Sequence, residues 1–144
     1  MVGACGEAAE KPTTTGPSIT IAQSQVGAVQ AWYDRWMESA GYEQNYFLGV
    51  FDTYTHAEEF ERASRACDTF GLAKFPGWRE TIGTAPEPSI DALVQEYLDR
   101  FEAALVACVA ADGDVDALLT ATYQIIDARA PLLELQSRLT NSGG

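Results

Sequence analysis

Apolar residues recur every three or four positions along most of this chain, and this spacing predicts amphipathic helices. The clearest helix covers 89–110, with Ser89 as its expected N-cap. Its apolar stripe consists of Ile90, Leu93, Val94, Tyr97, Phe101, Leu105 and Cys108. No stretch shows the alternation of apolar and polar residues that favours a strand. The pattern therefore predicts an all-α protein.

Capping signals divide the rest of the chain into further helices. Thr20 with Gln23 predicts a helix that ends at Gly41, and Thr55 with Glu58 predicts another that ends at Gly71. Between these two, 42–54 is short and aromatic and predicts a helical turn or two. Asp114 is expected to cap the next helix, whose inward residues would be Val115, Leu118, Leu119, Thr122, Ile125 and Ile126. Pro131 must kink this helix or begin a new one.

A proline- and glycine-rich stretch, 71–88, shows little periodicity and predicts a long connection between two helices. Trp78 would hold this connection against the bundle. Residues 18–144 then form one domain, a single bundle of four to five helices with the long 71–88 connection.

Charge and hydropathy limit the partners that this domain can have. The chain has 144 residues and a net charge of −12. Nucleic acid is disfavoured as a partner, because binding to phosphates depends on Lys and Arg, and anionic lipid headgroups are disfavoured for the same reason. The apolar run "AALVACVAA" (103–111) is far shorter than the roughly 20 residues that a transmembrane helix needs.

The N-terminal residues Val2-Gly3-Ala4-Cys5 resemble the lipobox of bacterial lipoproteins. The resemblance implies a diacylglycerol on Cys5 and an extracytoplasmic protein that contacts the membrane only through this lipid. A charged and apolar leader would precede such a motif, so we expect Met1 to mark a trimmed start. Residues 1–17 are rich in Gly, Pro, Thr and Glu and are expected to form a disordered tether.

Cys67 and Cys108 both lie on the apolar stripes of their helices. In an exported protein such a pair can form a disulfide; the alternative is two buried free thiols. If both helices end near their cysteines, a bridge requires the helices to run parallel, since a disulfide joins Cα atoms less than about 7 Å apart. The connection 71–88 is long enough for the crossover that a parallel pair needs.

Catalytic and metal-binding patterns are weak in this sequence. His56 is the only histidine, and Cys67 follows it by 11 residues, on the order of 16 Å along a helix. The stretch "DGDVD" (112–116) lacks the glycine and glutamate that a calcium-binding EF-hand loop requires. We therefore expect a non-catalytic protein, and assign neither metal ligands nor a cofactor.

Aromatic residues are concentrated between positions 32 and 54, where neighbours in sequence cannot all face one core. Exposed aromatic side chains often mark interaction surfaces. The candidate partner-binding residues are Trp32, Tyr33, Trp36, Tyr46, Phe47 and Tyr54. Core packing alone could also explain the cluster. A further alternative is a helical core that carries an apolar small molecule, either haem or a lipid.

The function that these patterns favour is a surface-tethered helical lipoprotein that docks another envelope protein or membrane complex. The expected disulfide, the expected anchor and the aromatic region all fit this interpretation. The carrier of an apolar ligand is the alternative.

Overall fold

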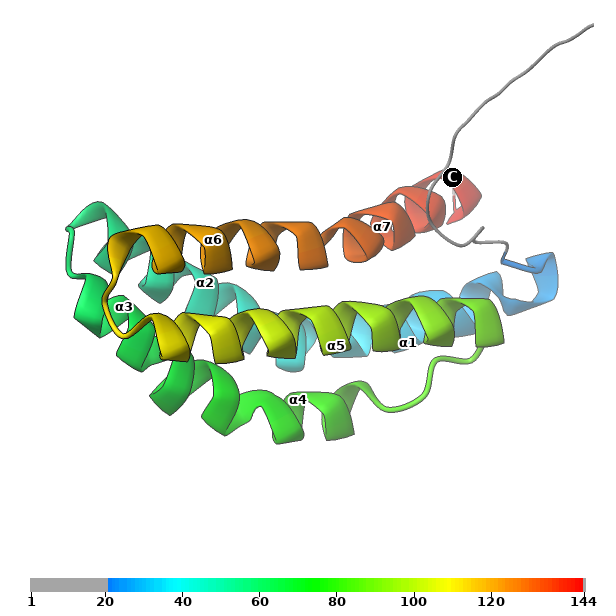
Figure 1. The fold of residues 1–144 in the computed structure, drawn as a ribbon. Helices are drawn as coiled ribbons and strands as arrows, with labels where there is room; N and C mark the ends of the chain where they lie inside the picture. Colours follow the sequence, from blue (N-terminus) through cyan, green and yellow to red (C-terminus); the bar gives the residue numbers. More distant parts are fainter. Residues whose placement is uncertain (1–20, 144) are drawn as a thin grey trace, which may run out of the picture.

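The computed structural model describes residues 21–143, with side chains up to residue 140. The expected lipid site at Cys5, the tether 1–17 and the cap at Thr20 lie outside the described residues. All regular elements of the described part are helical (Figure 1). They are η2 (Gln23–Gln25), α1 (Val26–Glu38), α2 (Ala40–His56), α3 (Phe60–Ala66), the π-helical segment η3 (Cys67–Leu72), α4 (Ala73–Ile82), α5 (Pro88–Ala111), α6 (Val115–Ala128) and α7 (Ala130–Gly143).

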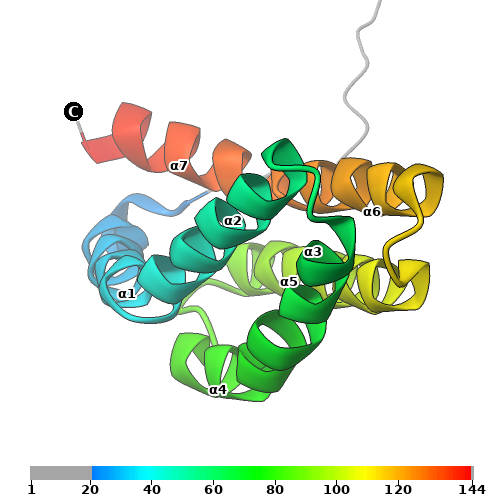
Figure 2. The same cartoon turned by 90° about the vertical axis from the view of Figure 1, so that its left-hand side faces the viewer.

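These elements form five rods around one core in the described part of the chain. Helices α3, η3 and α4 follow one another without interruption and make a single bent rod, and α6 and α7 are separated only by Arg129 (Figures 1 and 2). The core contains the largest fully buried side chains, among them Trp36, Phe47, Phe75 and Phe101. The expected all-α bundle of four to five helices is thus confirmed. None of the helices described is both long and apolar enough to cross a membrane.

The long connection expected over 71–88 is mostly helical, which corrects that prediction. Gly71 does not end a helix: it lies in η3 and is buried against α5, where an added Cβ would come within 2.9 Å of Leu105 Cδ2. Pro76 lies inside this continuous rod, shortly after the π-helical segment η3, and the helix continues through it although proline has no backbone amide to donate. The true loop is 83–87, and Trp78 packs α4 onto the core rather than holding a loop.

The disulfide between Cys67 and Cys108 is present, with a Cα–Cα distance of 6.1 Å, and both residues are buried. The parallel arrangement that we expected for it is wrong. Because the helix continues past Gly71 to Ile82, the α3–η3–α4 rod and α5 form an antiparallel hairpin.

Three contacts define the direction of this hairpin. The Gly113 amide donates to Ser64 Oγ at 3.0 Å near one end, and Arg79 Nη2 lies 2.7 Å from Asp99 Oδ1 near the other. The disulfide lies between these two contacts. The two rods therefore run antiparallel. Cys67 and Cys108 meet near the end of the hairpin that lies away from the 83–87 turn.

Several helix boundaries also differ from the sequence-based expectation. The break after α1 lies at Ser39, and Gly41 is inside α2. Thr55 caps no helix, because α2 continues through it and its hydroxyl donates to the Asp52 carbonyl at 2.9 Å. Residues 42–54 therefore belong to a full helix rather than a short turn.

The helices of the second half begin largely as their sequences indicate. Glu87, rather than Ser89, is the N-cap of α5, and its side chain accepts from the Ser89 amide. Asp114 caps α6 as predicted, accepting from the Ala117 amide at 2.9 Å. Pro131 is the second residue of a new helix, α7. Of the two expected outcomes, a kink or a new helix, the structure shows the new helix.

Candidate functional site

Four of the six aromatic residues that the sequence suggested for partner binding are buried, which corrects their assignment. They are Trp32, Tyr33, Trp36 and Phe47. Neighbouring residues of α1 can both be buried because α1 packs against α2, α4 and α7 on different sides. Trp32 Nε1 also donates to the Ile82 carbonyl at 2.8 Å, which joins α1 to the end of α4. These four side chains hold the bundle together and are not available to a partner.

A buried polar cluster lies among these aromatic rings. Gln44 is 3% exposed, and its Oε1 accepts from Trp36 Nε1 and from the Tyr97 hydroxyl, both at 3.3 Å. Burial raises the pKa of both Tyr97 and Tyr33, so both phenols are neutral, and the Tyr97 hydroxyl donates its proton to Gln44 Oε1. Gln44 Nε2 has no hydrogen-bond partner in the described part of the chain.

The remaining two candidates lie on the outer side of α2, where a third tyrosine joins them. Tyr46 is 59% exposed and Tyr54 is half-buried, while Tyr42, one turn before Tyr46, is 66% exposed. We call these three residues the tyrosine face. Their spacing of four and eight residues places them along one side of α2. Tyr46 stacks on Phe70 of η3 at a ring-centroid distance of 5.8 Å, so the face extends onto the neighbouring rod.

A hollow of about 400 Å³ lies at the surface where the end of α2 packs beside α3 and η3, which are its neighbours in Figure 2. Its walls include Val50, Tyr54, Phe70 and two arginines, Arg62 and Arg65. Arg62 lies over the Tyr54 ring at 5.3 Å and pairs with Glu59 at 2.6 Å, and this hydrogen-bonded partner raises the pKa of Arg62. The hollow therefore combines aromatic surface with cations in a chain whose net charge is strongly negative.

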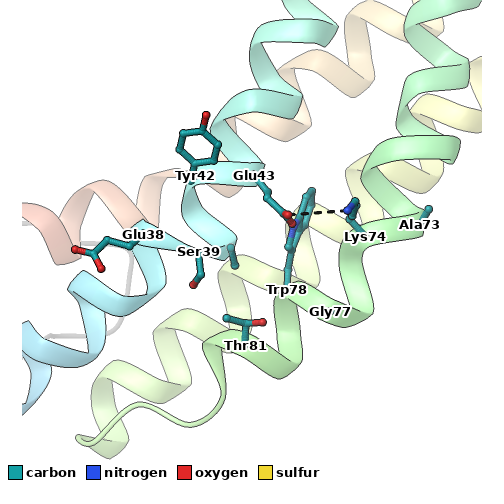
Figure 3. A pocket seen from close by; sticks show the side chains of 10 residues that line it. Glu38, Ser39, Tyr42, Glu43, Ala73, Lys74, Gly77, Trp78 and Thr81 are labelled. Atoms are coloured by element: carbon teal, nitrogen blue, oxygen red, sulfur yellow. Dashed lines mark hydrogen bonds and ion pairs between the residues drawn. The ribbon is translucent and has the colours of Figure 1, made fainter.

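A second hollow, of about 430 Å³, lies at the other end of the tyrosine face, between the start of α2 and α4 (Figure 3). Glu43 lies across it: its Oε1 accepts from Trp78 Nε1 at 2.8 Å, and its Oε2 lies 3.9 Å from Lys74 Nζ. Tyr42 also lines this hollow, and its ring points away from Glu43 and Trp78 in Figure 3. The Glu43 carboxylate is thus hydrogen-bonded to Trp78, and it forms a polar part of the wall of this hollow.

Elsewhere, the residues considered for catalysis lie apart from one another. His56 is exposed at the end of α2, where its Nδ1 lies 2.9 Å from the Asp52 carbonyl oxygen. Cys67 and Cys108 are oxidised in the disulfide and offer no thiolate. In the part of the chain that the structure describes, no three His, Cys, Asp or Glu side chains are grouped to hold a metal ion.

The candidates predicted from the sequence include Tyr46 and Tyr54 but not their neighbours Tyr42, Arg62, Arg65 and Phe70. A usable signal was present, because Arg62 and Arg65 are spaced by three residues and stand on one helix of a strongly acidic chain. The sequence does not reveal that α2 packs beside α3, and it is this packing that places Arg62 and Arg65 in the same hollow as Tyr54. In comparisons with known proteins, no family model, curated protein or solved structure matches this chain.

Proposed function

We propose that this chain is a non-catalytic, lipid-anchored interaction module of the bacterial cell envelope, and that the tyrosine face docks a partner protein. The observation that carries the proposal is the exposure of Tyr42 and Tyr46 on one side of α2, between two hollows. Tyrosine is enriched at protein interfaces because it offers a large apolar ring and a polar tip. The lipobox-like Val2-Gly3-Ala4-Cys5 and the disulfide support a location outside the cytoplasm.

The chemistry of the face indicates the kind of partner segment that fits it. Arg62 and Arg65 supply cations beside the aromatic rings of Tyr54 and Phe70. A partner segment with a carboxylate next to an apolar side chain would pair with the arginines and cover the rings. The alternative function, an apolar ligand in the core, has no comparable support. The rings of Trp36, Tyr97 and Phe101 already contact one another there, at centroid distances of 5.8 Å.

A photocrosslinking experiment in cells tests the docking face. We expect benzoylphenylalanine at position 46 to yield one major protein adduct of defined mass. The same group at position 84, exposed in the loop before α5, should yield less than a fifth as much. Adding Arg65→Glu should reduce the adduct at position 46 at least fivefold, because the substitution replaces one of the two cations of the hollow with a carboxylate.

Arg35→Glu is the matched control, since Arg35 is exposed on α1 and its substitution makes the same change in net charge. It should leave the adduct yield unchanged. Equal yields at positions 46 and 84, or equal effects of the two arginine variants, would rule out the tyrosine face as the docking site.

A further inference from the structure

Helices α6 and α7 carry two separate apolar seams. The inner seam, buried in the bundle, consists of Leu118, Ala121, Ile125, Ala128, Leu132, Leu135 and Leu139. Its spacing alternates strictly between three and four residues, which is the repeat by which one helix packs lengthwise along another. The sequence predicts that Val115, Leu119 and Ile126 also face inward, and this prediction is wrong, because the structure shows all three exposed.

The outer seam consists of Leu119, Tyr123, Ile126, Ala130 and Leu133. It repeats the alternation of four and three residues, and its four large side chains are between 50% and 58% exposed. Val115, at 51% exposure, extends the strip to the start of α6. From Val115 to Leu133 the strip is about 27 Å long at 1.5 Å per residue. Figure 1 shows α6 and α7 nearly in line, along the side of the bundle away from α4.

We propose that the outer seam docks an α-helix of a partner protein, and that this helix carries Lys or Arg beside its apolar stripe. A heptad-like seam favours a helix over an irregular segment, because knobs-into-holes packing needs the same repeat on both sides. The proposal does not depend on the tyrosine face, which lies on α2.

Charge decides which helix fits this seam. Asp116, Asp127 and Glu134 follow one border of the seam at helical spacing. In the described part of the chain, no cation pairs with Asp116 or Asp127, while Glu134 pairs with Arg138 at 2.8 Å. A helix with basic residues beside its stripe would meet these unpaired carboxylates, as the flanking charges of coiled coils do.

The same charges disfavour other occupants. A second copy in antiparallel pairing would bring the acidic borders together, and each copy carries a net charge of −12. An anionic lipid surface would be repelled for the same reason. Residues 1–20 of this chain have too few large apolar side chains at a regular spacing to form a second stripe.

Peptide binding tests the proposal on the full chain. The probe is a 21-residue helical peptide with Leu at its a and d positions and Lys at e and g, compared with a scrambled peptide of identical composition and with a peptide that has Glu in place of Lys. We expect the Lys heptad peptide to bind at least tenfold more tightly than either comparison peptide in isothermal titration. Equal binding of the Lys heptad and scrambled peptides would overturn the proposal, because charge alone would then explain the affinity.

Three double variants distinguish the outer seam from its acidic border and from the tyrosine face. Leu119→Ser with Ile126→Ser leaves the net charge unchanged and should weaken binding at least tenfold, whereas Tyr42→Ser with Tyr46→Ser should have no effect. Asp116→Asn with Asp127→Asn should weaken binding several-fold and reduce its dependence on salt. Binding that survives the Leu119/Ile126 variant would contradict the proposal. So would a concentration-dependent dimer in sedimentation, or adsorption to phosphatidylcholine vesicles that the same variant abolishes.

Discussion

Replacement of Trp36 by alanine should lower the free energy of unfolding by about 3–5 kcal/mol, the usual cost of truncating a large buried aromatic side chain. Trp36 is 1% exposed, and its ring lies 5.4 Å from that of Trp32 and 5.8 Å from that of Tyr97. The substitution would leave a cavity and would remove one of the two donors to Gln44 Oε1. Chemical denaturation followed by far-ultraviolet circular dichroism measures this loss directly.

Tyr42→Ala is the matched control for this prediction. Tyr42 lies six residues later, in the next helix, and is 66% exposed, so its truncation should change the free energy of unfolding by less than about 0.5 kcal/mol. Similar losses for the two variants would show that Trp36 is not part of a close-packed core.

Removal of the disulfide should cost about 4 kcal/mol by the chain-entropy estimate for a bridge that closes a loop of this size. The bridge spans 41 residues and joins the α3–η3–α4 rod to α5 far from their connecting turn. Without it, the unfolded chain gains conformational freedom while the folded hairpin keeps its other contacts. The variant Cys67→Ala with Cys108→Ala should therefore unfold at a markedly lower denaturant concentration than the oxidised protein.

Reduction of the unmodified chain supplies the control for this second prediction. The chain treated with dithiothreitol should unfold close to the midpoint of the double alanine variant. If the oxidised and reduced chains unfold at the same midpoint, the bridge is absent or contributes nothing to stability.

Much of the fold could be predicted because its signals are local. The periodic stripe of α5 and the Asp114 cap of α6 depend on residues a turn or two apart, and both indicate helix without help from the rest of the chain. The pairing of Cys67 with Cys108 could also be predicted, since both lie on buried stripes.

The errors arise where packing overrides a local signal. Gly71 and Pro76 indicate a break, yet Gly71 is buried against Leu105 and the helix continues through Pro76 to Ile82. The same error produced the parallel helices, because it placed the turn too early in the chain. Only tertiary contacts reveal where the turn lies.

The candidate site shows the same limit. The sequence predicts an aromatic cluster that includes Tyr46 and Tyr54. It does not predict which of the rings are exposed, because the exposure of a ring depends on the helices packed around it. Trp32 and Tyr33 are adjacent and both buried because helices pack on several sides of α1. In α6, Leu118 and Leu119 are adjacent but only Leu118 is buried, since α6 packs through one narrow seam. Apolar character alone does not distinguish these two cases.

The proposal that this chain is a lipid-anchored module outside the cytoplasm is tested most directly by mass spectrometry of the protein purified, without a reducing agent, from both the membrane fraction and the cytosolic fraction of its native cells. We predict a diacylglycerol on Cys5 and a peptide pair joined through Cys67 and Cys108. An unmodified Cys5 together with free thiols at both other cysteines, in protein recovered from the cytosol, would contradict the account.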